Sequence, residues 1–174
     1  MFKDLKLLKV FFESSLREFN VREIAKEVKI TPATASKALK DLVKKKILKV
    51  RFERVYHLYK ANLEEDSYRD LKLWYNLRKI KESGLLEEIN KFYLKPTVVF
   101  FGSGADGSDT EDSDLDLLII SERKMDFPNQ KIWEKKLNRK LQLVIVTEIK
   151  ELGNKHLINN ILNGLVIQGE VKWI

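Results

Sequence analysis

The sequence predicts an α/β fold in its C-terminal part, preceded by a smaller helical part that ends in a β-hairpin. After Pro96, short apolar runs typical of buried strands alternate with helical segments. Before residue 62, helical patterns are followed by a segment in which apolar and polar residues alternate. The first 62 residues hold 16 basic and 7 acidic side chains, whereas 17 basic and 19 acidic ones follow.

Composition restricts the classes of function. The chain has 174 residues, 44% hydrophobic and 34% charged, which is typical of a soluble globular protein. It has no cysteine, which excludes disulfides and thiolate chemistry and fits a reducing cytosol, so a cytoplasmic location is expected. No apolar run approaches the roughly 18 residues of a membrane span, so no membrane association is expected. The basic first third favours an anionic polymer as its partner.

The N-terminal elements follow from periodicity and capping signals. A helix is expected over 4–18 and a second over 21–28. A third is expected over 32–46, because Thr31 is a good N-cap and Pro32 suits the first turn. Apolar and polar residues alternate over residues 48–60, as expected for two short strands. The first helix is expected to bury a stripe of four residues: Leu5, Leu8, Phe12 and Leu16.

This order of elements over residues 4–62 resembles the winged helix–turn–helix family. The resemblance implies double-stranded DNA as a partner, with Thr31, Thr34, Ser36 and Lys37 closest to it. Further candidate DNA-binding residues are Lys40 and Lys44 on the helix and Lys49, Arg51 and Arg54 on the wing. Two alternatives stay open, a merely solvated lysine-rich face and a winged helix that binds protein. Winged helices commonly dimerise on two-fold sites, which makes a homodimer an expected state.

Two connecting helices are expected over 66–82 and 84–93, with a break near Ser83-Gly84. The first is expected to bury Leu71, Trp74, Tyr75 and Leu77. The sequence thus predicts a DNA-binding domain over 1–62, a helical linker over 63–94 and an α/β domain over 95–174. Within the last, strands are expected over 97–101, 115–120 and 141–146, a helix over 129–140, and a final helix from Lys155 that ends near Gly164 before a short segment.

The loop after the first of these strands contains a dinucleotide-binding pattern, G-x-G-x-x-G, at Gly102, Gly104 and Gly107. A Rossmann turn must open a long helix, and its acidic partner lies about 20 residues further on. Here only residues 108–113 separate Gly107 from the next apolar run. The segment is too short for a crossover helix, so the Rossmann interpretation is excluded.

A second pattern in the same loop fits better. Gly102-Ser103 ends a strand, where main-chain N–H groups can meet phosphate oxygens. Asp114 and Asp116 are two apart at the start of the next strand, so their side chains share one face. Two adjacent carboxylates in a cleft repel each other unless a cation neutralises them, and Mg²⁺ prefers such oxygen ligands.

The pattern in this loop is Gly-Ser, then ten residues, then Asp-x-Asp. It resembles the motif of the minimal nucleotidyltransferases of the DNA-polymerase-β-like superfamily. The resemblance covers about residues 90–174 and implies a mixed α/β sheet with flanking helices. It implies transfer of a nucleoside monophosphate from an NTP, expected to be ATP, to a protein or other hydroxyl. Gly102, Ser103 and Gly107 match the nucleotide-binding residues, and Asp114 and Asp116 match the catalytic metal ligands. Some members are antitoxins that modify a partner protein, so a toxin partner is one expected acceptor.

Two departures from the family pattern leave catalysis open. The family often has a third carboxylate on the strand after the next helix, where this chain has Gln142. An amide is no general base and a poor Mg²⁺ ligand, so a second Mg²⁺ would be weakly held. The loop also lacks the arginine or tyrosine that the family frequently has after Gly-Ser. The alternative function is a transcriptional regulator whose second domain binds nucleotide or a partner without catalysis.

Overall fold

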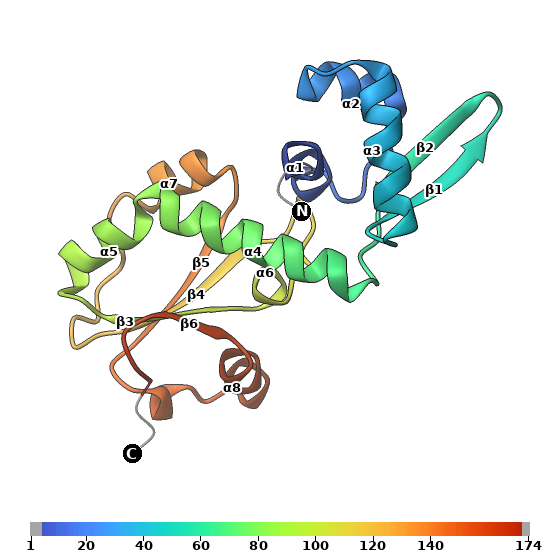
Figure 1. The fold of residues 1–174 in the computed structure, drawn as a ribbon. Helices are drawn as coiled ribbons and strands as arrows, with labels where there is room; N and C mark the ends of the chain where they lie inside the picture. Colours follow the sequence, from blue (N-terminus) through green and yellow to red (C-terminus); the bar gives the residue numbers. More distant parts are fainter. Residues whose placement is uncertain (1–4, 172–174) are drawn as a thin grey trace. The chain divides into compact units, whose positions relative to one another are not determined.

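The computed structural model describes residues 5–171 and divides the chain into two compact units, Met1–Tyr75 and Asn76–Ile174 (Figure 1). The boundary falls within helix α4 (Asp66–Ser83). The predicted division at residues 62 and 94 stays a prediction. No helix in the described part of the chain combines the length and the apolar character that a bilayer crossing requires.

The described part of the first unit contains three complete helices, α1 (Leu5–Glu13), α2 (Val21–Val28) and α3 (Pro32–Lys44), and capping groups mark the starts of α2 and α3. Asn20 and Glu23 form a capping box at the start of α2. The Thr31 hydroxyl accepts a hydrogen bond from the Thr34 N–H at the start of α3. The expected cap and the three expected helices are therefore present, although α1 and α3 end earlier than predicted.

The core of the first unit differs from the predicted stripe on α1. Leu7, Leu8, Phe11 and Phe12 are buried, whereas Leu5 is only partly buried and Leu16 is 45% exposed. The prediction for Leu16 was wrong because α1 ends at Glu13, so Leu16 is not on the helical face. Buried residues of α2, α3 and the hairpin complete this core, among them Ile24, Leu39, Leu42, Leu48 and Tyr59.

Strands β1 (Leu48–Glu53) and β2 (Tyr56–Ala61) form an antiparallel hairpin. Its base packs into the core through Leu48, Tyr59 and Ala61. Beyond Leu48 every residue of β1 is exposed, and Figure 1 shows the hairpin extending beyond the three helices of this unit.

The second unit is built on a mixed sheet with strand order β5-β4-β3-β6. Strand β4 is parallel to β5 and antiparallel to β3, and β6 is antiparallel to β3. The expected mixed sheet with flanking helices is therefore present. The elements after α4 are α5 (Leu85–Tyr93), β3 (Thr97–Phe101), α6 (Ser103–Asp106), β4 (Leu115–Ile120), α7 (Gln130–Leu137), β5 (Leu141–Val146), a 3-10 helix (Ile149–Glu151), α8 (Lys155–Leu162) and β6 (Leu165–Gln168).

Helices lie on both sides of this sheet, with α5 and α7 on one side and α8 on the other (Figure 1). On the α8 side, Val99, Phe101 and Leu118 pack with Ile149 and Ile161. Because side chains alternate along a strand, Asp116 points to the same side as Leu118. The sheet thus places the predicted metal ligand on its α8 side.

Two expectations along α4 and the second unit were wrong. Residues 103–106, expected as loop, form the short helix α6, and Trp74 of α4, expected to be buried, is 41% exposed. In addition, the short segment after α8, for which the sequence predicted no strand, contains β6; its last residues, 172–174, lie outside the described part. A Cβ at Gly164 would lie 2.7 Å from the Phe100 carbonyl oxygen, so glycine allows the chain to turn closely against β3.

Candidate functional site

The two predicted metal ligands lie at the N-terminal end of β4. Asp116 is the second residue of the strand, and Asp114 is the residue immediately before the strand begins. Leu115 and Leu117, on the opposite face, are buried as expected. The register places Asp116 beside Phe101, the last residue of β3, and beside Gln142, the second residue of β5. Asp116 therefore lies between the end of one strand and the beginning of another.

The electrostatic environment of Asp116 disfavours its charged form. Burial raises the pKa of the Asp116 carboxyl, and the negative charge of Asp114 raises this pKa further, whereas the positive charge of Arg139 opposes the shift. The influence of Asp114 is repulsion between two carboxylates at short range. A divalent cation shared by both would relieve that repulsion, and Mg²⁺ takes such oxygen ligands.

The glycine turn after β3 faces the same carboxylate. Gly102 has φ of 73°, and a Cβ at this position would overlap the Asp116 Oδ2 atom. Only glycine satisfies both conditions without strain. Ser103 begins α6, and Gly107 ends it with φ of 73°. The structure thus brings Gly102 against Asp116, with Ser103 adjacent in the chain.

The third position, Gln142, lies on β5 directly opposite Asp116 and is exposed. Paired residues of neighbouring strands point to the same face, so an amide stands where the family often has a carboxylate. Within residues 5–171, no group of three or more His, Asp or Glu side chains is placed to hold a metal ion. Among the residues that the structure describes, Asp114 and Asp116 therefore form an acidic pair that no third acidic side chain completes.

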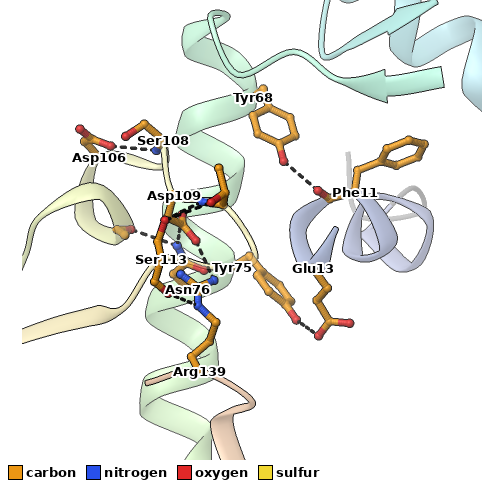
Figure 2. Close-up of polar contacts among 12 residues, drawn as sticks. Phe11, Glu13, Tyr68, Tyr75, Asn76, Asp106, Ser108, Asp109, Ser113 and Arg139 are labelled. Atoms are coloured by element: carbon orange, nitrogen blue, oxygen red, sulfur yellow. Dashed lines mark hydrogen bonds and ion pairs between the residues drawn. The ribbon is translucent and has the colours of Figure 1, made fainter. Parts of the chain in front are cut away.

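A buried polar network beside the pair was missed by the sequence analysis. The Asp109 side chain is fully buried. Its Oδ2 atom pairs with Arg139 Nη1 at 2.9 Å, and its Oδ1 atom accepts a hydrogen bond from Asn76 Nδ2 at 2.8 Å (Figure 2). These residues belong to α4, the acidic loop and the turn before β5, so no local pattern in the sequence indicates that they meet.

Arg139 makes one further bond, and one of its guanidinium nitrogens has no partner among the described residues. Its Nε donates to the carbonyl oxygen of Ser113 at 2.7 Å. Its Nη2 atom is buried without a hydrogen-bond partner among the described residues. A buried donor left without an acceptor costs about 1–3 kcal/mol. Arg139 also lines an open cleft of about 450 Å³ that Asp114 and the acidic loop border.

The predicted DNA-binding residues of the first unit are mostly on its surface. Along α3 and its cap they form an exposed polar face, in which Ser36 alone is partly buried: Thr31, Thr34, Ser36, Lys37, Lys40 and Lys44. The two threonine hydroxyls contact each other at 2.9 Å. This face combines small hydroxyl residues at the start of α3 with lysines further along it.

The three predicted wing residues differ in their environments. Arg51 donates two hydrogen bonds to Glu18, at 2.7 and 2.6 Å, and also pairs with Glu53. Lys49 pairs with Glu64. Arg54 is at the hairpin turn with φ of 54°. Carboxylates thus compete with any phosphate for Lys49 and Arg51, which the sequence analysis did not anticipate.

The family of the chain follows from comparison with known proteins. A family model described as a nucleotidyltransferase domain matches residues 77–167, which is more than half of the chain. The protein therefore belongs to the nucleotidyltransferase domain family. A search of curated proteins found no match. The matched range holds the glycine turn, the aspartate pair and Gln142, and it leaves the first unit outside the match.

Proposed function

We propose that the protein is a Mg²⁺-dependent nucleotidyltransferase that transfers a nucleoside monophosphate from an NTP, with ATP as the expected donor, to a hydroxyl acceptor. The observation that carries this proposal is the close approach of the glycine turn to Asp116, one member of the aspartate pair. Gly102 lies so close to Asp116 that a phosphate held by the turn would lie beside the carboxylates. Membership of the nucleotidyltransferase domain family supports it.

Each group has a role in this mechanism. Asp114 and Asp116 would hold Mg²⁺, which when bound supplies charge neutralisation to the phosphate oxygens. The main-chain N–H groups at Gly102 and Ser103 would orient the triphosphate. Gln142 cannot accept the proton of the attacking hydroxyl, so that proton must leave to solvent, to substrate or to a group of the acceptor. A protein partner, including a toxin partner, is the acceptor we favour.

The test is transfer of label from α-labelled ATP in the presence of Mg²⁺, with the protein itself and candidate partner proteins as acceptors. Wild type should transfer label, and Asp116→Asn should lower the rate by about 10³-fold, since several kcal/mol of charge stabilisation are removed. Asp112→Asn, which removes an exposed carboxylate of the same loop, is the matched control and should transfer normally. Transfer by Asp116→Asn at the wild-type rate would refute the proposal.

A second function, a regulator that binds nucleotide without transferring it, is favoured by one observation. Gln142 stands directly opposite Asp116, where a carboxylate would complete the metal site. Isothermal calorimetry with Mg²⁺ and ATP, combined with the label-transfer assay, separates the two functions. Binding of ATP without transfer to any acceptor would establish the regulator.

For the first unit we propose a winged helix–turn–helix that binds double-stranded DNA through α3 and the hairpin. Three helices followed by a hairpin, the exposed polar face of α3 and the basic first third support this. Lysines bind phosphates by counterion release, so log K should fall with log salt by about 0.9 for each phosphate neutralised. Gel-shift titrations of the full chain at several salt concentrations test this, and salt-independent binding would contradict it. Homodimerisation on a two-fold site stays a prediction.

A further inference from the structure

We propose that Arg139 is a positioning residue that, with Asp109 and Asn76, fixes the metal-binding end of β4 relative to the glycine turn. The inference rests on the proposed function, because it assigns the network to the same site. Figure 2 shows the three side chains close together, and Asp109 bonds to both of the others.

On one side the network holds the start of β4. Arg139 Nε donates to the carbonyl oxygen of Ser113, the residue before Asp114. The same guanidinium donates through Nη1 to Asp109. The position of the main chain that carries Asp114 is therefore tied to the position of the Asp109 carboxylate.

On the other side the network holds the turn. Asn76 Nδ2 donates both to Asp109 Oδ1, at 2.8 Å, and to the carbonyl oxygen of Gly104, at 3.0 Å. Gly104 is the second residue of α6, directly after Ser103. The Asp109 N–H in turn donates to the carbonyl oxygen of Ser103 at 3.2 Å. A continuous chain of hydrogen bonds thus links the residue before Asp114 to the residues after Gly102.

Burial makes this link stiff. Asp109 is fully buried, and Arg139 is only 10% exposed. A buried carboxylate must keep its partners, so the network resists any shift that would break one bond. The guanidinium fork also reaches two acceptors in fixed directions, which a lysine ammonium on a flexible stem cannot reproduce. Both halves of the candidate site are anchored through main-chain carbonyl oxygens, so loss of the network would move the main chain of the site.

The experiment uses the full-length protein with Arg139→Lys and, separately, Asn76→Ser. The matched control is Tyr93→Phe, which removes the partly buried hydrogen bond from the Tyr93 hydroxyl to the Met125 carbonyl oxygen elsewhere in the same unit. The first measurement is amide hydrogen exchange in the absence of ligand. We expect the amides of Ala105, Ser108 and Asp109 to exchange at least about tenfold faster in both variants than in the control. In the variants, a local opening of the turn no longer has to break the hydrogen bonds of the network.

The second measurement is function at saturating ATP and Mg²⁺. A misplacement of about 1 Å costs on the order of 100-fold, so kcat should fall about 100-fold in Arg139→Lys while the melting temperature stays close to that of the control. An equal fall of kcat in Tyr93→Phe and Arg139→Lys would show a merely structural role and overturn the proposal. Should Arg139→Lys fail to fold, Asn76→Ser alone decides, because it leaves the ion pair intact.

The outcomes separate this inference from the proposed function. Wild-type protein that neither binds nor transfers ATP would refute the proposed function, and hydrogen exchange would then decide whether the network holds the turn. Wild-type exchange rates at Ala105, Ser108 and Asp109 in both variants would overturn the inference even if wild type is an active transferase.

Discussion

The two units differ in how strongly the surrounding structure fixes the candidate functional residues. In the second unit, Asp116 is partly buried and is held between Gly102 and Gln142 by strand register. In the first unit, the predicted DNA-binding residues line an exposed face of α3, where each can contribute separately. The comparison teaches that single substitutions should act sharply in the second unit and gradually in the first.

Gly102→Ala should strongly impair nucleotidyl transfer. The added Cβ would overlap the Asp116 carboxylate, and the backbone at φ of 73° would be strained, so the turn must move. We expect labelled-ATP transfer to fall by about 100-fold or more, an order of magnitude taken from misplacement by about 1 Å. Gly153→Ala is the control, because a Cβ there meets nothing within 4 Å. Equal activity of both variants would show that the contact between turn and carboxylate is unimportant.

Leu39→Ala tests whether the two units depend on each other. Leu39 is fully buried in the core of the first unit, so the change should lower the free energy of unfolding of that unit by about 2–5 kcal/mol. Urea denaturation followed by hydrogen exchange in each unit measures this. Binding of Mg²⁺ and ATP by the second unit should survive. Loss of this binding at urea concentrations that unfold only the first unit would show that the two units are not independent.

Gln142→Glu should raise the rate of nucleotidyl transfer by the second unit. A carboxylate opposite Asp116 could bind metal and accept the proton of the attacking hydroxyl, a contribution of typically about 10²–10⁴-fold. Single-turnover transfer of label measures the gain. Gln142→Met, close in size but without a ligand oxygen, controls for packing, and equal rates in the two variants would contradict the assignment of this position.

The pH dependence of metal capture follows from the raised pKa of Asp116. Only the ionised carboxylate binds a divalent cation, so capture should be lost as pH falls, starting at a higher pH than for an ordinary aspartate. Burial is the main cause and Asp114 the second. Titration with subsaturating Mn²⁺, followed by electron paramagnetic resonance at several pH values, measures the loss, because excess metal would displace the proton and lower the midpoint. A midpoint at or below the usual aspartate range would contradict the expected electrostatics.

Lys37→Ala and Lys40→Ala should act gradually on DNA binding. Both lysines are exposed on α3, and the slope of log K against log salt should become shallower by about 0.9 for each phosphate that the variant no longer neutralises. Gel-shift titrations give the slopes, with Lys135→Ala on the second unit as the control. An unchanged slope in the variant that carries both substitutions would contradict a contact between α3 and DNA.

Glu18→Gln should have the smallest effect and would release Arg51 from its strongest partner. The hydrogen bonds from Arg51 lower the pKa of the Glu18 carboxyl, so this pair stabilises the fold at neutral pH, and the contribution is lost as pH falls through that lowered pKa. The variant should melt slightly lower than wild type at pH 7 and equally in strong acid. Tighter DNA binding by the variant would support a contact from Arg51.

Local signals in the sequence predicted much of the fold. Thr31 and the break at Gly84 marked helix boundaries, because capping and turn conformation depend on neighbouring residues. Gly102-Ser103 and the aspartate pair indicated a nucleotidyltransferase domain, which the family match over residues 77–167 confirms. β6 was missed because a short apolar run after a helix has no period of its own.

The remaining errors and omissions are tertiary in origin. Leu16 was misplaced because the end of α1 at Glu13 carries no strong stop signal. The network of Asn76, Asp109 and Arg139 joins three separate segments, so it exists only once the sheet has set their positions. The pairing of Arg51 with Glu18 likewise joins residues that are 33 positions apart.

The place of Gln142 in the sheet bears on how such a protein can change over evolutionary time. Strand β5 stands at the margin of the sheet, and the Gln142 side chain is exposed there. Exchange of an exposed side chain on such a strand typically alters folding stability by less than about 0.5 kcal/mol. One codon change at this position could therefore convert between a nucleotide sensor and a catalyst while the architecture stays intact.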